Sequence, residues 1–202
     1  MVNPNTRWQS FYQDDQSLVQ IPHSQAAQFA VECFLQSNKQ FILDLGCGAG
    51  RDSTYLAERA LKVIGLDAAR SGLTLAQNRK IKVDLFLKYI EGDARNLPIA
   101  TNSIEGVFCF GLLHEFVSES SKEIVKCVME EIYRVLQKNG ILILAVLAGE
   151  PDKGLPQVQL FTEDMFDEAT SGLKRIVKKT YKDLGCTGKT DYRVWYGQFE
   201  KI

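Results

Sequence analysis

The sequence has few residues of the kinds that bind metals or build disulfide frameworks. Only two histidines occur in 202 residues, and neither a Cys-x-x-Cys nor a His-x-x-x-His spacing is present, so no metal site is expected. The five cysteines are odd in number and mostly lie inside apolar runs, as buried thiols do. This pattern favours a reducing, cytoplasmic location over a disulfide-linked secreted protein.

Long apolar runs and an excess of charge of one sign are also absent. The longest apolar run, Ile141 to Ala148, is far shorter than the ~20 residues that a membrane-spanning helix needs, and the N-terminus lacks a basic-then-apolar signal pattern. A net charge of −1 provides no general attraction to nucleic acids or anionic lipids. We therefore expect no membrane insertion and no nucleic-acid partner. The length of the chain predicts a single domain over residues 1–202, which we expect to be a monomer or a homodimer.

Short apolar, β-branched runs alternate along the chain with helical patterns. Such alternation predicts an α/β fold with a parallel sheet. The five strands are expected at residues 41–45, 61–66, 86–90, 104–110 and 141–147. Two further strand-like segments, 173–181 and 192–202, flank a turn-forming sequence at 185–188, which predicts a C-terminal antiparallel pair. The expected architecture is a Rossmann-like doubly wound sheet of seven strands.

Three helices can be placed from capping signals and apolar spacing. Ser24 can cap a helix whose apolar residues run from Ala26 to Phe34 at helical spacing. A second apolar stripe begins at Ser121 and is expected to stop at Asn139-Gly140, a suitable C-terminal cap. A short third helix is expected at 162–169.

A glycine-rich turn follows the first predicted strand. Gly46, Gly48 and Gly50 alternate with other residues before a helical run that begins at Arg51, so the backbone can approach a ligand near free N–H groups. A dinucleotide-binding turn would need glycine where Arg51 stands, and Asp44 would repel a pyrophosphate but attract an ammonium group. An amino-acid-bearing cofactor therefore fits this turn better than a dinucleotide, although glycines also end strands for purely structural reasons.

The segment Leu43-Asp-Leu-Gly-Cys-Gly-Ala-Gly-Arg-Asp-Ser53 resembles the first motif of class I S-adenosylmethionine-dependent methyltransferases, in particular the tellurite-resistance and quinone-biosynthesis types. The resemblance runs in order from about residue 25 to 147. It implies the seven-stranded methyltransferase fold, S-adenosylmethionine as cofactor and S-adenosylhomocysteine as product. On this basis residues 24–147 are the expected cofactor-binding core.

The resemblance also implies which residues contact the cofactor, segment by segment. The acidic residue that ends the second strand, Asp67, would accept hydrogen bonds from the ribose hydroxyls. Asp93 and the backbone of Ala94 would bind the adenine, and the end of the fourth strand would lie against the methionine part. The full set of expected cofactor contacts is Asp44, Gly46, Cys47, Gly48, Gly50, Asp67, Ala68, Gly92, Asp93, Ala94, Phe110 and Gly111.

The expected acceptor is a small molecule. The Asn/Asp-Pro-Pro-aromatic sequence of methyltransferases that act on base amines or glutamine is replaced by Phe110-Gly-Leu-Leu. His114 and Glu115 are candidate general bases, and His114 has the alternative of a structural hydrogen bond. Cys47 is expected to pack inside the turn, although metalloid methylation with paired cysteines stays open.

Flanking segments complete the expected site. The aromatic residues Trp8, Phe11 and Tyr12 lie in a segment, residues 1–23, that would form a lid over the cofactor or simply anchor the terminus. Residues 148–202 would supply a substrate-side loop and the C-terminal hairpin. Two other functions stay open: a nucleotide-dependent oxidoreductase, and a non-catalytic cofactor-binding or scaffold protein with the same fold.

Overall fold

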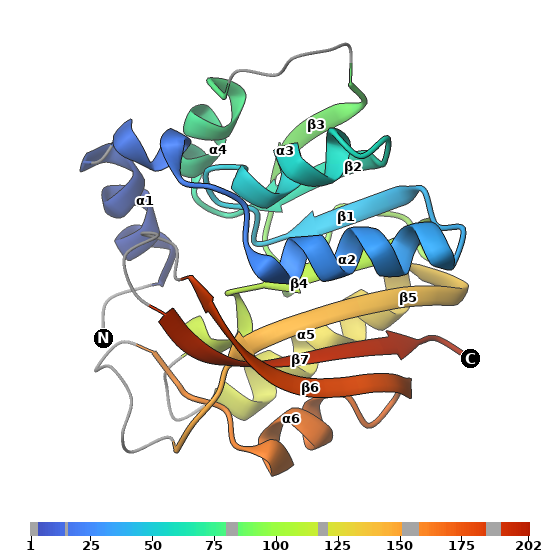
Figure 1. The fold of residues 1–202 in the computed structure, drawn as a ribbon. Helices are drawn as coiled ribbons and strands as arrows, with labels where there is room; N and C mark the ends of the chain where they lie inside the picture. Colours follow the sequence, from blue (N-terminus) through green and yellow to red (C-terminus); the bar gives the residue numbers. More distant parts are fainter. Residues whose placement is uncertain (1–3, 15, 80–84, 117–120, 151–157, 185–190) are drawn as a thin grey trace.

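A computed structural model describes residues 4–14, 16–79, 85–116, 121–150, 158–184 and 191–202. Its centre is one sheet with the strand order β3-β2-β1-β4-β5-β7-β6 (Figure 1). The strands are β1 (Phe41–Leu45), β2 (Lys62–Asp67), β3 (Leu87–Glu91), β4 (Ile104–Phe110), β5 (Leu136–Leu147), β6 (Lys174–Leu184) and β7 (Asp191–Glu200). The first five are parallel, and β7 lies antiparallel between β5 and β6. The predicted fold class is confirmed.

Helices cover both faces of the sheet, as the doubly wound prediction requires. Buried residues of α2 and α3 share one apolar cluster with the sheet, and those of α5 and α6 share another. The helical elements are α1 (Pro4–Asp14), the 3-10 turn η1 (Gln16–Gln20), α2 (Gln25–Gln36), α3 (Arg51–Ala57), α4 (Arg70–Gln77), the 3-10 turn η2 (Leu113–Glu115), α5 (Ser121–Val135) and α6 (Glu163–Ala169).

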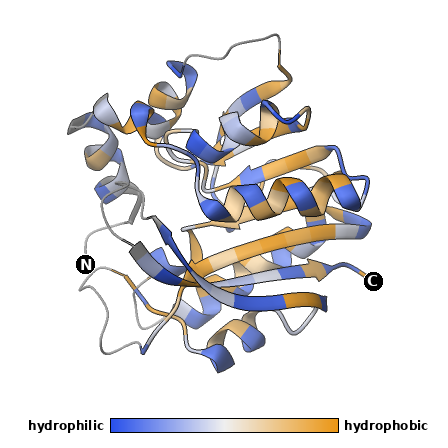
Figure 2. Cartoon of the chain, in the orientation of Figure 1, coloured by the Kyte–Doolittle hydropathy of each residue, from blue (hydrophilic) through white to orange (hydrophobic). Residues whose placement is uncertain are grey.

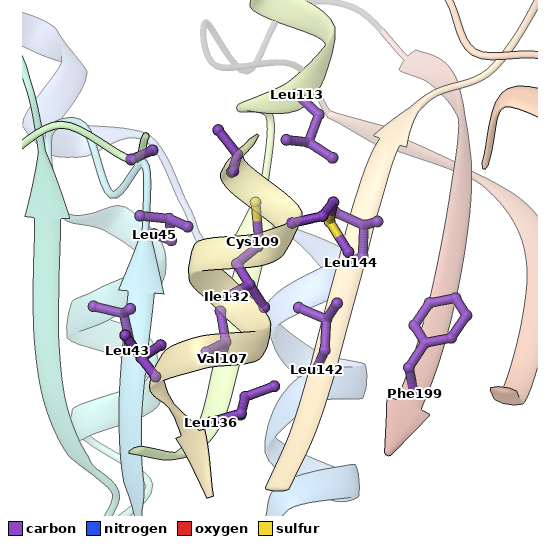
Figure 3. Close-up of a cluster of buried hydrophobic side chains, with 14 of the residues drawn as sticks. Leu43, Leu45, Val107, Cys109, Leu113, Ile132, Leu136, Leu142, Leu144 and Phe199 are labelled. Carbon is purple, nitrogen blue, oxygen red and sulfur yellow. The ribbon is translucent and has the colours of Figure 1, made fainter. Parts of the chain in front are cut away.

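Alternate residues of each central strand feed the two clusters, because successive strand side chains point to opposite faces. Ile42 of β1 packs with α2 and α3, whereas its neighbour Leu43 packs toward α5. Figure 3 shows the second cluster, where side chains of β1, β4, β5 and α5 meet. The central strands are accordingly apolar almost throughout, while the edge strand β6 is mostly hydrophilic (Figure 2).

The predicted helix after Ser121 is wrong at its C-terminal end. Helix α5 stops at Val135, four residues before Asn139, and Leu136 already pairs with Ile104 of β4. Asn139 does take a left-handed φ of 60°, but it lies within β5 and donates its N–H to Lys201 O at 2.8 Å. Pairing with the neighbouring strands therefore overrides the local capping signal.

Other local predictions are confirmed. The Ser24 side chain caps α2 by accepting a 3.0 Å hydrogen bond from the Ala27 N–H, and Thr162 caps α6 in the same way. The predicted hairpin turn at 185–188, including Cys186, and residues 151–157 of the predicted substrate-side loop lie outside the described residues.

The N-terminal helix α1 packs beside α4 rather than on the sheet (Figure 1). Ser71 at the start of α4 donates its hydroxyl to Gln9 O at 2.7 Å and its N–H to the Gln9 side chain at 3.2 Å. Across the described ranges, no helix has both the length and the apolar character required to span a membrane.

Candidate functional site

A cavity of about 640 Å³ opens at the carboxyl ends of the first parallel strands. These ends meet at one edge of a parallel sheet, which is where ligands of such folds bind. The structure brings nearly all predicted site residues to its walls: Trp8, Phe11, Tyr12, Asp44, Gly46, Cys47, Gly48, Asp67, Ala68, Gly92, Asp93, Ala94, Phe110, Gly111, His114 and Glu115. Among the residues predicted for the site, Gly50 alone is not part of the lining.

The glycine turn between β1 and α3 has the backbone that its sequence predicts. Gly46, Gly48 and Gly50 have φ values of +79°, +50° and +72°, a region that other residues rarely occupy. The Gly50 N–H closes the turn on Cys47 O at 2.9 Å. A Cβ on Gly50 would clash with the Tyr89 hydroxyl and lie 2.7 Å from Ala76 Cβ, so this glycine allows close packing behind the cavity wall.

Asp44 is a buried carboxyl group at the end of β1. It is 2% exposed and accepts a 2.5 Å hydrogen bond from the Ser53 hydroxyl. Burial, reinforced by the charge of Asp52, raises the pKa of Asp44 to about 8. A cationic group entering the cavity next to Asp44 would favour its charged form.

Asp67, at the end of β2, is held by backbone N–H groups. One carboxylate oxygen accepts from Gly48 and the other from Ala69, both at 2.8 Å. Burial raises the pKa of Asp67, and these two hydrogen bonds oppose that change. Each oxygen keeps a second lone pair, so the oriented carboxylate can still accept hydrogen bonds from a ligand.

Asp93 lies in a more open part of the cavity than Asp67. Both of its oxygens accept from the Arg95 guanidinium at 2.6 to 3.0 Å, and this pairing lowers the pKa of Asp93. The neighbouring Ala94 is buried. Arg95 also lines the cavity, and sequence reasoning missed it because an arginine two residues after a strand-end acid has no distinctive spacing.

His114 and Glu115 lie together on η2, after β4. The Leu147 N–H points to His114 Nδ1 at 3.3 Å, and Nε2 of the same ring lies 3.5 Å from Glu115 Oε1. Burial, with a smaller contribution from the Arg7 charge, lowers the pKa of His114 to about 3, so the ring is neutral at pH 7. The neutral ring accepts at Nδ1 and carries its proton at Nε2, facing Glu115.

Glu115 connects this end of the cavity to α1. Its Oε2 accepts a 3.2 Å hydrogen bond from the Trp8 indole and forms an ion pair with Arg7. Trp8 in turn packs against Phe11 and Tyr12, with ring centroids 5.0 and 5.5 Å away. The aromatic segment and the η2 acid therefore form one connected wall.

Further lining residues were not singled out from the sequence, although Val158 and Tyr192 lie in the segment 148–202 that was expected on the substrate side. They come from α5, β5, β7 and the segments before α6 and after α4, and they include Arg79, Ile124, Leu147, Val158 and Tyr192. No motif marks Arg79 or Ile124, because these residues reach the cavity only through packing of distant elements.

The fold and the cavity define a doubly wound domain with a cavity beside a strand-end glycine turn. Residues 43–144, about half of the 202-residue chain, match the family described as a methyltransferase domain. The chain belongs to this methyltransferase family. The resemblance seen in the glycine turn is thus confirmed.

Individual relatives agree with this assignment. An uncharacterised methyltransferase of Synechocystis is 34% identical over 120 residues, which cover 59% of this chain and 53% of the relative. A demethylmenaquinone methyltransferase of Oceanobacillus iheyensis is 30% identical over 148 residues, 70% of this chain and 57% of the relative. The chain thus spans only about half the length of these curated relatives.

Solved structures share the fold at low sequence identity. A S-adenosylmethionine-dependent methyltransferase of Methanosarcina mazei superposes with a TM-score of 0.71 at 18% identity, covering 86% of this chain and 97% of that protein. The 1,6-didemethyltoxoflavin N1-methyltransferase of Burkholderia thailandensis superposes with a TM-score of 0.72 at 16% identity, covering 100% of this chain and 92% of that protein.

Proposed function

We propose that this protein transfers a methyl group from S-adenosylmethionine to a small-molecule acceptor and releases S-adenosylhomocysteine. The observation that carries the proposal is the oriented Asp67 carboxylate beside the glycine turn, at the wall of a cavity of about 640 Å³. Family membership favours this function over the nicotinamide-dependent oxidoreductase that the glycine turn alone left open.

The residues of the cavity fit the chemical groups of this methyl donor. Asp67 can accept from the two ribose hydroxyls, and Asp93 with the Ala94 N–H can bind the adenine edge. Asp44 matches an ammonium group, because its buried carboxyl gains a counter-charge when that group binds. The positive-φ glycines Gly46 and Gly48 let the backbone approach the ligand closely.

The end of the cavity near η2 is the proposed acceptor pocket. Bound S-adenosylmethionine supplies an electrophilic methyl group on a sulfonium, so the protein's main task is to align the acceptor with it and exclude water. His114 Nδ1 already accepts from the Leu147 N–H, so His114 is better suited to orient Glu115 than to take a proton. Glu115 is the proposed base for an acceptor that must lose one.

The α1 helix is the proposed lid of the site. Trp8, Phe11 and Tyr12 line the cavity, and Trp8 with Arg7 is bound to Glu115. A lid held in this way would remove water from both the methyl group and Glu115, which strengthens the electrostatic interactions inside. The apolar lining contributed by Ile124, Leu147 and Val158 favours an acceptor with an apolar body.

Calorimetric titration with S-adenosylmethionine, S-adenosylhomocysteine and NAD(P)H tests the donor. We expect micromolar binding of the first two and no binding of the nicotinamide, with Asp67→Ala as the matched variant of lower affinity. Binding of NAD(P)H alone would overturn the proposal.

A second assay tests turnover itself. Production of S-adenosylhomocysteine would be followed with thiols, metalloids, quinol precursors and small amines as acceptors. Donor binding without methylation of any acceptor class would instead support the non-catalytic alternative.

A further inference from the structure

Arg79, two residues beyond α4, is a partly buried cation whose hydrogen bonds go to main-chain carbonyls. Its Nε donates to Ala49 O at 2.6 Å and its Nη2 to Leu18 O at 2.9 Å, while Nη1 lies 3.5 Å from Ile21 O. Burial lowers the pKa of Arg79, yet a guanidinium remains charged at neutral pH. One rigid, planar donor group thus holds two segments that are about thirty residues apart in the sequence.

The first segment held by Arg79 is the glycine turn. Ala49 lies between Gly48 and Gly50, whose backbones are both left-handed. The hydrogen bond from Arg79 fixes the Ala49 carbonyl on the side away from Cys47, and the Gly50 N–H of the same peptide unit then points to Cys47 O. Arg79 therefore stabilises the turn conformation that faces the cavity.

The second segment is η1, which connects the lid helix to α2. Leu18 in η1 is 3% exposed and also lines the cavity. At the other end of α4, the Ser71 hydroxyl donates to Gln9 O. The neighbouring Gly72 leaves room for the Tyr12 ring, because a Cβ at position 72 would lie only 2.9 Å from that ring. Helix α4 with Arg79 thus holds α1 and η1 at both of its ends.

We propose that Arg79 is a positioning residue that locks the glycine turn to η1 and so seats α1 over the cavity. Its effect on cofactor affinity rests on the proposed function, whereas its effect on the seating of α1 does not. A lysine keeps the charge but lacks the planar fork that reaches two carbonyls at once, so Arg79→Lys should retain only part of the effect. Arg79→Met should lose all of it.

Fluorescence of Trp8 measures the seating of α1 without any ligand. The chain has two tryptophans, so Trp195→Phe leaves Trp8 as the only one, and this variant serves as the parent protein. In Arg79→Met we expect the acrylamide quenching constant of Trp8 to rise about twofold or more, because release of a segment exposes its side chains to solvent. Arg79→Lys should give an intermediate value. Arg70→Met is the control, because Arg70 begins the same helix with its side chain 78% exposed and should leave quenching unchanged.

The second readout is the affinity for S-adenosylhomocysteine. Arg79→Met should weaken binding about tenfold, the scale of one charged hydrogen bond, with partial recovery in Arg79→Lys. Thermal unfolding would establish that each variant is folded at the assay temperature, and Arg79→Lys decides the question if Arg79→Met does not fold.

Two outcomes separate the inference from the proposed function. A folded Arg79 variant with the quenching constant of the parent would overturn the role of Arg79, whatever its effect on ligand binding. Failure of the parent to bind S-adenosylhomocysteine would overturn the proposed donor, while the quenching comparison would still decide the role of Arg79.

Discussion

The Asp67 carboxylate and the Gly48 N–H form a 2.8 Å hydrogen bond that joins the end of β2 to the glycine turn after β1. Asp67 ends β2 and Gly48 follows β1, and these two strands are parallel neighbours, so the bond fixes the spacing between two walls of the cavity. The same carboxylate accepts from the Ala69 N–H and is therefore fully oriented before any ligand binds. Such preorganisation lowers the cost of binding hydroxyl groups.

Replacing Asp67 with alanine should weaken cofactor binding. We expect a loss of about 1.5 to 3 kcal/mol in the binding free energy of S-adenosylhomocysteine, the scale of hydrogen bonds to a charged group. Calorimetry measures the change, and Asp67→Asn should lose affinity as well, because its amide NH2 would face one of the two backbone N–H groups that the carboxylate oxygens accept. An unchanged affinity in folded Asp67→Ala would remove Asp67 from the binding site.

Binding of the cofactor should release a proton from Asp44. The pKa of about 8 means that this carboxyl is mostly protonated at pH 7 in the free protein, and an ammonium group beside it would lower that pKa. Titrations in two buffers of different ionisation enthalpy should therefore give different binding enthalpies. The difference should reach at most about the difference between the two ionisation enthalpies, which corresponds to one released proton. Asp44→Asn should abolish the difference. Equal heats for the unchanged protein in both buffers would contradict an ammonium contact at Asp44.

Buried His114 should weaken the fold in mild acid relative to a variant that lacks it. Its folded pKa of about 3 lies below the ordinary value of 6.5, so below pH 6.5 the unfolded chain binds a proton that the folded chain does not. The contribution of His114 to the free energy of unfolding should fall by about 1.4 kcal/mol per pH unit in this window. The raised pKa of Asp44 acts in the opposite direction, so the comparison is made between the unchanged protein and His114→Gln. Urea unfolding at pH 7 and pH 5 should show the unchanged protein losing stability relative to His114→Gln. Because Asp44 and His23 are present in both proteins, their titrations cancel in this difference, and parallel pH profiles would refute the prediction.

The two η2 residues should differ in their kinetic effects. Glu115→Gln keeps a carbonyl for the Trp8 indole but removes the base, so we expect kcat to fall about a hundredfold with an acceptor that must lose a proton. His114→Gln should reduce kcat less, because Nδ1 is already bound by the Leu147 N–H. Both variants should change kcat more than they change the affinity for S-adenosylhomocysteine. An equal loss of kcat and affinity at either position would indicate a structural role instead.

Gly50→Ala should destabilise the protein. The alanine would have to adopt a φ of +72° and place its Cβ 2.7 Å from Ala76 Cβ, so we expect a loss of about 2 to 4 kcal/mol in the free energy of unfolding. Gly172→Ala is the matched control, because a Cβ there has nothing within 4 Å. Equal unfolding midpoints for the two variants would show that the turn tolerates a side chain.

The parts of the site predicted from sequence are those whose chemistry is local. The glycines Gly46, Gly48 and Gly50 predicted a tight turn, because glycine adopts backbone conformations that other residues rarely occupy. The acids at the ends of β1 and β2, Asp44 and Asp67, meet at one edge because parallel strands align their carboxyl ends. The predicted strands and the family resemblance also depended on short stretches of sequence, namely the apolar runs and the motif around the glycine turn.

Tertiary packing decided the remainder. The contact of Leu147 with His114 joins residues 33 positions apart, that of Trp8 with Glu115 joins residues 107 positions apart, and neither pair has a sequence signature. The end of α5 at Val135 was likewise set by pairing of Leu136 with β4, against the local cap at Asn139. Local sequence thus determined the turn and the strand-end acids, whereas long-range packing determined the lid contacts, the histidine tautomer and the role of Arg79. The physical reason is that a turn depends on the backbone preferences of a few adjacent residues, while these contacts depend on how distant elements share one core.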